Sequence, residues 1–228
     1  NGHVDVTLSD GTEKTIRIHE IHMEEDAGKL VHDEWEGVSY VDYNRSGVPL
    51  IEIVSEPDMR SAEEVIAYLT KLRTTIQYLG ASDCKLQEGS MRADVNLSVR
   101  ERGSSEFGTR TETKNLNSFA AIERAIKAET ARQIDLIEAG EKVVQETRRW
   151  NDDKEYSYAM RSKEDAQDYR YFPDPDLVPI HISDEYLAEL KAKQPEFKDE
   201  KKARYIEEFG LPEYDAEILT DSKKFTEI

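Results

Sequence analysis

The chain has 228 residues, with 49 acidic against 31 basic side chains, which gives a formal charge of −18 at pH 7. The sequence lacks a run of about 20 apolar residues, the length that a membrane-spanning helix needs, so we expect no membrane span. An average field this negative repels phosphate backbones, which excludes a protein that coats DNA nonspecifically. The single cysteine, Cys84, excludes a disulfide framework and a multi-cysteine zinc site.

Strand signals dominate the first sixty residues. Apolar and polar residues alternate over residues 4–8 and 16–18, on either side of a turn-forming Asp-Gly pair, and this pattern predicts a β-hairpin. The second strand continues to about Asp26 and becomes more polar along its length. Two further β-rich stretches follow within residues 39–54.

Two long helices are predicted. Ser61 begins the first, with Glu64 completing a capping box, and Gly80 ends it. The second runs from about Ser118 to Gly140. Apolar residues at helical spacing form the stripe that we expect to be buried on the second helix: Phe119, Ile122, Ile126, Ile134 and Ile137.

Between these helices, residues 91–100 and 109–115 are predicted to pair as strands of alternating character. Their pairing would gather carboxylates, amides and cations on one face, and the members of this polar face are Arg92, Asp94, Asn96, Ser98, Arg100, Arg110, Glu112 and Lys114. Such a face suits Mg²⁺ and a nucleotide, because hard oxygens bind the metal and cations bind phosphate. The alternative is a polar strand face that is simply solvated.

Two other segments contain residues that could bind a metal or a nucleotide. Residues 22–29 contain three consecutive carboxylates, which need a metal or, as the alternative, solvent to stabilise them. His19 and His22 fall on opposite strand faces and should not bind one ion together. Cations and aromatics mix around Arg149 and again over residues 161–172, and they could hold a nucleotide or an RNA end, or pack at the edge of a core.

Three prolines within residues 173–179 precede short helical patterns at residues 184–193, 198–209 and 214–219. We therefore predict an α+β domain over residues 1–179 and the beginning of an all-α domain over residues 180–228. The chain has no starting Met, so we expect it to be an internal part of a longer protein. The first domain would then lack its N-terminal part and the second its C-terminal part.

Several motifs occur in colinear order along nearly the whole chain: HMEEDAGK (22–29), DYNRSGVPLIEIVSEPD (42–58), EGSMRADVNLSVR (88–100), TKNLNSF (113–119), DYRYFPDPDLVP (168–179) and GLPEYDAEIL (210–219). Together they closely resemble the B-subunit family of aspartyl/glutamyl-tRNA amidotransferases. The resemblance implies an antiparallel or mixed sheet cradle like the catalytic fold of glutamine synthetase.

The resemblance also implies an activity. A member of this family would use ATP and Mg²⁺ to phosphorylate the side-chain carboxylate of Glu on tRNA(Gln) or of Asp on tRNA(Asn). Ammonia from the amidase A subunit would then form the amide, with a small C subunit as a further partner and no DNA. A cytoplasmic location in a bacterium, or in an organelle, would follow.

The site residues implied by the resemblance are the metal ligands Glu25, Asp94 and Glu112, the catalytic residues Arg92, Asn96, Lys114 and Asn115, and the nucleotide-binding residues Arg92, Lys114, Arg161 and Lys163. Two other functions remain open on the sequence. One is a noncatalytic scaffold that docks tRNA or other subunits and carries a degenerate nucleotide site. The other is a stand-alone ligase that joins glutamate and ammonia.

Overall fold

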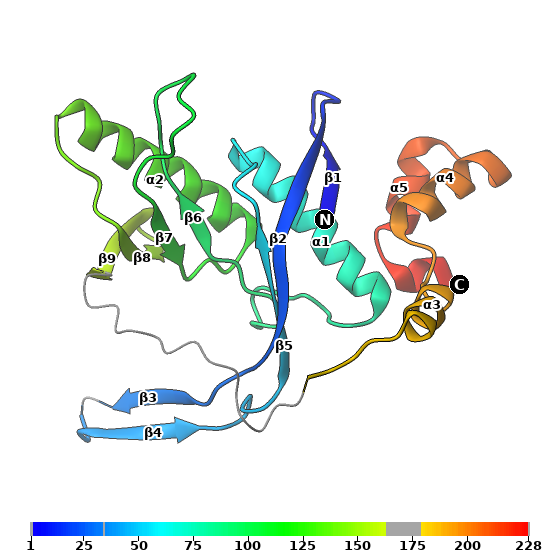
Figure 1. Ribbon diagram of the computed structural model, residues 1–228, viewed down its shortest axis with the longest axis horizontal. Helices are drawn as coiled ribbons and strands as arrows, with labels where there is room; N and C mark the ends of the chain where they lie inside the picture. The colour runs from blue at the N-terminus through cyan, green and yellow to red at the C-terminus, as the bar shows by residue number, and fades with distance from the viewer. Residues whose placement is uncertain (1, 34, 163–178, 228) are drawn as a thin grey trace. The chain divides into compact units, whose positions relative to one another are not determined.

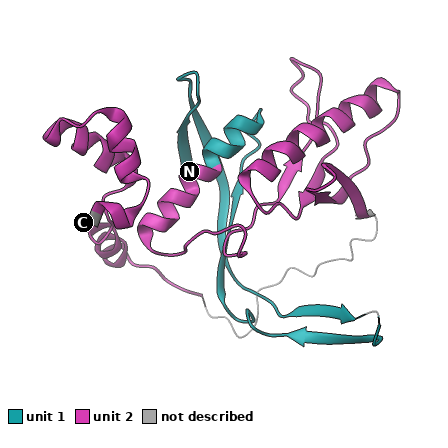
Figure 2. Cartoon of the chain, turned by 180° about the vertical axis from the view of Figure 1, so that it is seen from behind, with its two compact units in different colours: residues 1–68 teal, residues 69–228 magenta. Residues whose placement is uncertain are grey.

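The computed structural model describes residues 2–33, 35–162 and 179–227, and in these the fold is α+β, as predicted. The likeness to glutamine synthetase stays a prediction. The chain divides into two compact units, residues 1–68 and 69–228 (Figure 2), which are described separately. In the described part of the chain, no helix has the length and apolar character needed to cross a membrane.

The first unit contains a three-stranded antiparallel sheet in the order β1-β2-β5. Its strands are β1 (His3–Thr7), β2 (Glu13–Glu25) and β5 (Pro49–Ser55) (Figure 1). The predicted hairpin and its long second strand are confirmed, and Val6 and Ile16 are buried. A separate antiparallel pair, β3 (Lys29–Asp33) and β4 (Val38–Asp42), includes a strand that the sequence did not predict.

Helix α1 (Ala62–Leu79) begins and ends where the sequence indicates. The Ser61 hydroxyl accepts a hydrogen bond from the Glu64 backbone amide at 3.2 Å. Gly80, at φ +72°, follows the last turn. The Glu64 carboxylate accepts hydrogen bonds from the Arg60 backbone amide at 2.5 Å and from the Lys14 ammonium at 2.6 Å, in place of the Ser61 amide that a capping box would use. Only half of the predicted capping box is therefore formed, because Glu64 ties the helix to β2.

The second unit contains a four-stranded mixed sheet in the order β6-β7-β8-β9. Its strands are β6 (Val95–Leu97), β7 (Thr111–Lys114), β8 (Glu146–Asn151) and β9 (Tyr156–Ser162). The antiparallel β6–β7 pair confirms the predicted pairing, although β6 is much shorter than residues 91–100. Strand β8 pairs with β7 in parallel, and β9 pairs with β8 in the antiparallel sense.

Helix α2 (Phe119–Glu138) connects β7 to β8. Its buried positions are Ala121, Ile122, Ala125, Ile126, Glu129 and Gln133. The predicted apolar stripe is correct at Ile122 and Ile126 and wrong at Ile134 and Ile137, which are 41% and 50% exposed. The buried line continues through Glu129 and Gln133, because both make hydrogen bonds to Thr111 of β7.

The last part of the chain is helical, as predicted, with α3 (Asp184–Ala192), α4 (Lys198–Phe209), α5 (Glu213–Thr220) and a 3₁₀ turn (Lys223–Glu227). These elements are joined to the end of α1. The Tyr78 hydroxyl donates to the Thr220 carbonyl at 2.6 Å, and the Lys223 ammonium donates to the Tyr78 carbonyl at 3.0 Å. The domain boundary near residue 179 stays a prediction.

Candidate functional site

The polar face of the four-stranded sheet carries an acid–base–acid cluster. The Lys114 ammonium lies 2.6 Å from an Asp94 carboxylate oxygen and 3.4 Å from a Glu112 carboxylate oxygen. Partial burial lowers the pKa of Lys114, but the hydrogen bond to Asp94 and the charges of both carboxylates outweigh it, so the pKa is raised. Lys114 therefore stays charged at neutral pH.

Strand register places these residues on one face. Asn96 of β6 lies opposite Glu112 of β7, and Thr147 of β8 lies beside Glu112 and donates a hydrogen bond to its carboxylate at 2.9 Å. Lys114 is aligned with Arg149 of β8. Because aligned residues of neighbouring strands share a face, the predicted polar surface extends from β6 across to β8.

A cavity of about 340 Å³ lies beside this cluster. Residues 86–89, 91–94 and 115–117 line it, and Arg92, Asp94 and Asn115 are among them. Three of the predicted site residues thus line one cavity, and Lys114 contacts Asp94 at its wall. The arrangement offers both negative and positive groups to a polar ligand.

Asn115, a predicted catalytic residue, is held on both sides of its amide. Its backbone lies in the left-handed region, at φ 69°, which asparagine tolerates better than most residues. Its Nδ2 donates to the Trp150 carbonyl at 3.0 Å, and its Oδ1 accepts from Arg149 at 3.3 Å. Asn115 therefore connects the end of β7 to β8 at the wall of the cavity.

A buried polar network supports the sheet from the other face, and the sequence did not predict it. Glu129 accepts hydrogen bonds from Thr111 at 2.7 Å and from Arg132 at 2.6 Å, and Arg148 lies 3.5 Å from it. Burial raises the pKa of Glu129, but hydrogen bonds from Arg132, Gln133 and Thr111 outweigh it and lower the pKa. The spacing of Glu129 after Ile122 and Ile126 in the predicted stripe was the available signal.

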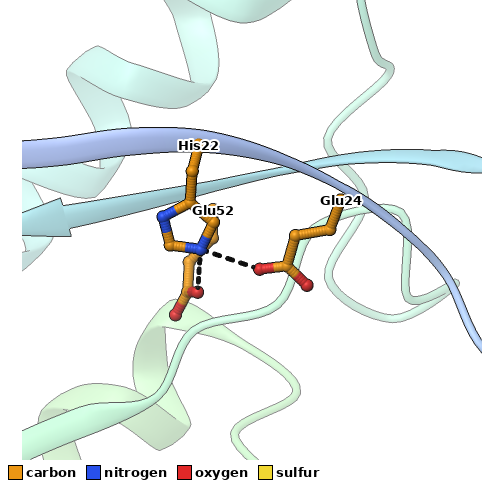
Figure 3. A group of neighbouring side chains, drawn as sticks. All are labelled: His22, Glu24 and Glu52. Atoms are coloured by element: carbon orange, nitrogen blue, oxygen red, sulfur yellow. Dashed lines mark hydrogen bonds and ion pairs between the residues drawn. The ribbon is translucent and has the colours of Figure 1, made fainter. Parts of the chain in front are cut away.

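A second cluster lies in the first compact unit, on β2 and β5 (Figure 3). The His22 Nε2 atom lies 2.9 Å from a Glu24 oxygen and 2.8 Å from a Glu52 oxygen, and the three candidate ligand atoms lie within 4.8 Å of one another. Desolvation lowers the pKa of His22, but its bonds to the two carboxylates raise it overall. One imidazole and two carboxylates fit a divalent cation.

Glu52 was missing from the predicted ligands, although the β2–β5 register places it directly opposite His22. Glu25, which was predicted, lies opposite Pro49, on the other face of β2 from Glu24. His19 contacts Glu56 at 2.9 Å and is not part of the cluster with His22, in line with the expected separation.

The other predicted site residues lie in different parts of the chain. Arg92 and Asn96 are exposed on the second unit, and Arg161 of β9 lies opposite Thr147. Lys163 lies outside the described residues. Glu25 belongs to the first unit, whereas Asp94 and Glu112 belong to the second, so the predicted set of three metal ligands stays a prediction.

Comparison with known proteins identifies the family. A family profile described as the GatB/GatE catalytic domain matches residues 1–188. Proteins named as the B subunit of aspartyl/glutamyl-tRNA(Asn/Gln) amidotransferase are similar to the chain, with 73% identity over all 228 residues in Agathobacter rectalis and 60% over 223 residues in Caldicellulosiruptor bescii. In Thermodesulfovibrio yellowstonii the identity is 53% over 227 residues.

The matched region covers all of the chain for the A. rectalis and T. yellowstonii proteins, and 98% of it for the C. bescii protein. It covers 48%, 46% and 47% of the A. rectalis, C. bescii and T. yellowstonii proteins, so the chain spans about half the length of these curated relatives. The profile match over most of the chain and the identities of its relatives show that the chain belongs to the GatB/GatE catalytic-domain family.

Proposed function

We propose that the chain is the carboxylate-activating part of the B subunit of a tRNA-dependent amidotransferase, which amidates Glu on tRNA(Gln) or Asp on tRNA(Asn). The observation that carries the proposal is the convergence of Asp94, Glu112 and Lys114 beside a cavity, in a chain that shares 53–73% identity with proteins of that name. Such a site binds anions and metal ions together, as the activation of a carboxylate by ATP requires.

The proposed reaction has two steps. A side-chain carboxylate oxygen attacks the terminal phosphorus of ATP, which forms a new O–P bond and releases ADP. Ammonia then attacks the acyl carbon, the bond to the phosphate oxygen breaks, and ammonia loses a proton as the amide forms. The first step needs no general base, because the carboxylate is already ionised at pH 7. This agrees with a site that offers cations and carboxylates.

In this proposal Lys114 stabilises charge on the transferring phosphoryl group. Its two carboxylate partners hold the ammonium at the cavity wall. The remaining residues proposed for the site of ATP and the activated carboxylate are Arg92, Asn96, Asn115, Arg161 and Lys163. The cavity supports this for Arg92 and Asn115, which line it.

Carboxylate oxygens are the protein ligands that Mg²⁺ prefers, and Asp94, Glu112, Glu24 and Glu52 offer them. Asp94 and Glu112 both lie against the Lys114 ammonium, at 2.6 and 3.4 Å, and oxygens of Glu24 and Glu52 lie within 4.8 Å of one another and of a His22 nitrogen. Bound Mg²⁺ would offset the charge of the phosphate oxygens. Glu25 remains a proposed ligand together with Asp94 and Glu112.

The proposed partners are an amidase A subunit that supplies ammonia, a small C subunit and the misacylated tRNA, in the cytoplasm. A formal charge of −18 disfavours nonspecific contact between this chain and the tRNA backbone. The proposal therefore requires localised tRNA contacts, or contacts from the partners and the rest of the protein.

The test is ATP- and glutamine-dependent amidation by the full-length protein in complex with its partner subunits, with Asp94→Asn and Glu112→Gln as variants. Asp199→Asn is the matched control, since this carboxylate pairs with Lys71 at an exposed position. We expect the two site variants to lose at least about a hundredfold in kcat/KM. The control should stay within about twofold of the parent.

Parent-like activity in both site variants would overturn the assignment of this site. The docking scaffold makes a different prediction, because it requires no turnover of ATP. Binding of tRNA without any binding of Mg²⁺-ATP to the full-length protein, measured by calorimetry, would favour the scaffold over the enzyme.

A further inference from the structure

We propose that Arg149 binds an oxyanion of the substrates, either a nucleotide phosphate or the side-chain carboxylate that is activated, and that Asn115 is its positioning residue. The inference rests on the proposed function and deepens it. Two consecutive arginines on β8, Arg148 and Arg149, have opposite surroundings.

Arg148 is a structural residue. It is 8% exposed, donates to the Ser157 hydroxyl at 2.8 Å and to the Ser157 carbonyl at 2.7 Å, and forms ion pairs with Glu129 and Glu146. Its charge is neutralised within the fold. It lies on the sheet face that α2 covers.

Arg149 points to the other face, because successive residues of a strand alternate. It is exposed, and its hydrogen bond is to a neutral group, the Asn115 amide oxygen, at 3.3 Å. Among the residues that the structure describes, it forms no ion pair with a carboxylate. Within the described residues the guanidinium charge is therefore oriented without being neutralised.

Asn115 is suited to orient this guanidinium. Its left-handed backbone and its Nδ2 bond to the Trp150 carbonyl direct Oδ1 toward Arg149. Strain of this kind, with φ 69° in a non-glycine residue, persists where surrounding contacts hold it. An aspartate would fit the same turn, but its charge would cancel the charge of Arg149.

The strand register places Arg149 beside the residues of the candidate site. Lys114 and Arg149 are aligned on β7 and β8, and Asn115 lines the same cavity as Arg92 and Asp94. Lys114 is paired with two carboxylates, whereas Arg149, in the part of the chain that the structure describes, is paired with the amide of Asn115 and with no carboxylate. A planar guanidinium binds the paired oxygens of a phosphate or carboxylate with two parallel hydrogen bonds. This binding is stronger when no carboxylate of the protein competes for the guanidinium.

The experiment uses the full-length protein in complex with its partner subunits and measures kcat and separate KM values for ATP and for the aminoacyl-tRNA. The variants are Arg149→Met, Arg149→Lys, Asn115→Asp and Asn115→Gly. Arg124→Met is the matched control, because this exposed arginine already pairs with Asp152 and Glu155. Thermal unfolding of each variant is recorded alongside.

We expect Arg149→Met to raise one KM at least about tenfold, with a change below about twofold in the control. A rise in the KM for ATP identifies the nucleotide phosphate as the oxyanion, and a rise in the KM for aminoacyl-tRNA identifies the carboxylate. Arg149→Lys should recover only part of the loss, because the ammonium lacks the planar pair of donors.

Asn115→Asp should raise the same KM although Arg149 is retained, and the recorded unfolding temperature measures the separate cost of losing the Nδ2 bond to the Trp150 carbonyl. Asn115→Gly keeps the left-handed backbone accessible and should give a smaller increase. KM values within about twofold of the parent in both Arg149→Met and Asn115→Asp would overturn the inference.

Direct binding separates this inference from the proposed function. Calorimetry with ATP, and separately with free glutamate, measures oxyanion binding without turnover. If the parent complex shows no amidation but Arg149→Met weakens the binding of one probe, the proposed function fails and the role of Arg149 stands. Binding of both probes that Arg149→Met leaves unchanged, or no binding of either probe to the parent, overturns the role of Arg149.

Discussion

Glu129 and Arg148 are 2% and 8% exposed, which is unusual for charged side chains. An isolated buried charge would cost several kcal/mol, and each of these charges is balanced by the other and by the surrounding donors and acceptors. Thr111 contributes in both directions, since it donates to Glu129 and accepts from Gln133 at 2.9 Å. The network thereby fixes α2 against the sheet whose other face carries the candidate site.

The Thr111→Val substitution tests this network. Valine keeps the shape but removes one donor and one acceptor from buried partners, so the free energy of unfolding should fall by about 1–2 kcal/mol. Urea denaturation of the chain measures the change. Thr147→Val is the control, because Thr147 is half-buried and water can replace its bond to Glu112. Equal losses in the two variants would contradict the special role of the buried network.

Asp58 gives a prediction for pH. The side-chain hydrogen bond from Arg17 lowers the pKa of Asp58 from 3.8 to about 2, against the opposing effect of burial. A carboxyl with a lowered pKa stabilises the fold above its unfolded-state pKa, and this contribution is lost as the pH falls from about 4 to about 2. Arg17 is 65% exposed, so solvent screening reduces the expected loss to about 1 kcal/mol.

Comparison with Asp58→Asn isolates this contribution from the other carboxylates. Urea denaturation measures the difference in the free energy of unfolding between parent and variant. This difference should shrink by about 1 kcal/mol as the pH falls from about 4.5 to about 2.5. A difference that does not depend on pH would show that the Arg17–Asp58 pair contributes nothing through its charge.

At the scale of elements, α2 begins at a local signal. Ser118 has an extended backbone, and its hydroxyl accepts a hydrogen bond from the Ala121 amide at 3.0 Å. It thereby pairs one of the donors that the first helical turn leaves unpaired. The Ser118→Ala substitution should lower the free energy of unfolding by about 1 kcal/mol, measured by urea denaturation. Ser118→Asp should retain the parent stability, since it keeps an acceptor. A loss in the aspartate variant equal to that in the alanine variant would contradict the capping role.

These local signals explain which elements the sequence predicts. The ends of α1 and α2 depend on Ser61, Gly80 and Ser118, which act on neighbouring backbone, and the hairpin of β1 and β2 depends on a short turn. The parallel pairing of β7 with β8 depends on how the 20-residue helix that connects them packs against one face of the sheet. No residue near β8 encodes that partner, so Thr147 and Arg149 could not be placed on the polar face in advance.

In the candidate site, too, local patterns predict some features and tertiary pairing decides others. Alternation along β6 and β7 was enough to predict that Asn96, Glu112 and Lys114 share a face, and Lys114 does contact Asp94 and Glu112. The partner of His22 was not predictable, because Glu52 reaches it only through the β2–β5 register, 30 positions along the chain. Periodicity places a side chain on a face, whereas the choice of partner is made by tertiary pairing.

At the scale of the whole chain, the charge of −18 opposes compaction. Folding brings like charges closer together, and their repulsion varies with the square of the net charge. Exposed ion pairs such as Lys193–Glu189 oppose this effect, but pairs of this kind contribute about 0–1 kcal/mol each and are themselves screened by salt. The repulsion should therefore dominate the salt dependence of stability.

The free energy of unfolding should accordingly rise by at least about 1 kcal/mol between about 10 mM and about 300 mM NaCl, because the Debye length falls from about 30 Å to below 10 Å over this range. Urea denaturation at constant pH measures it. Choline chloride is the control for cation binding at the carboxylate clusters, since a bulky cation screens as well as Na⁺ but cannot enter a small oxygen site. Equal gains in both salts indicate screening, whereas a gain confined to NaCl indicates a bound ion. Stability that falls with salt in both would mean that the ion pairs of the fold outweigh its net charge.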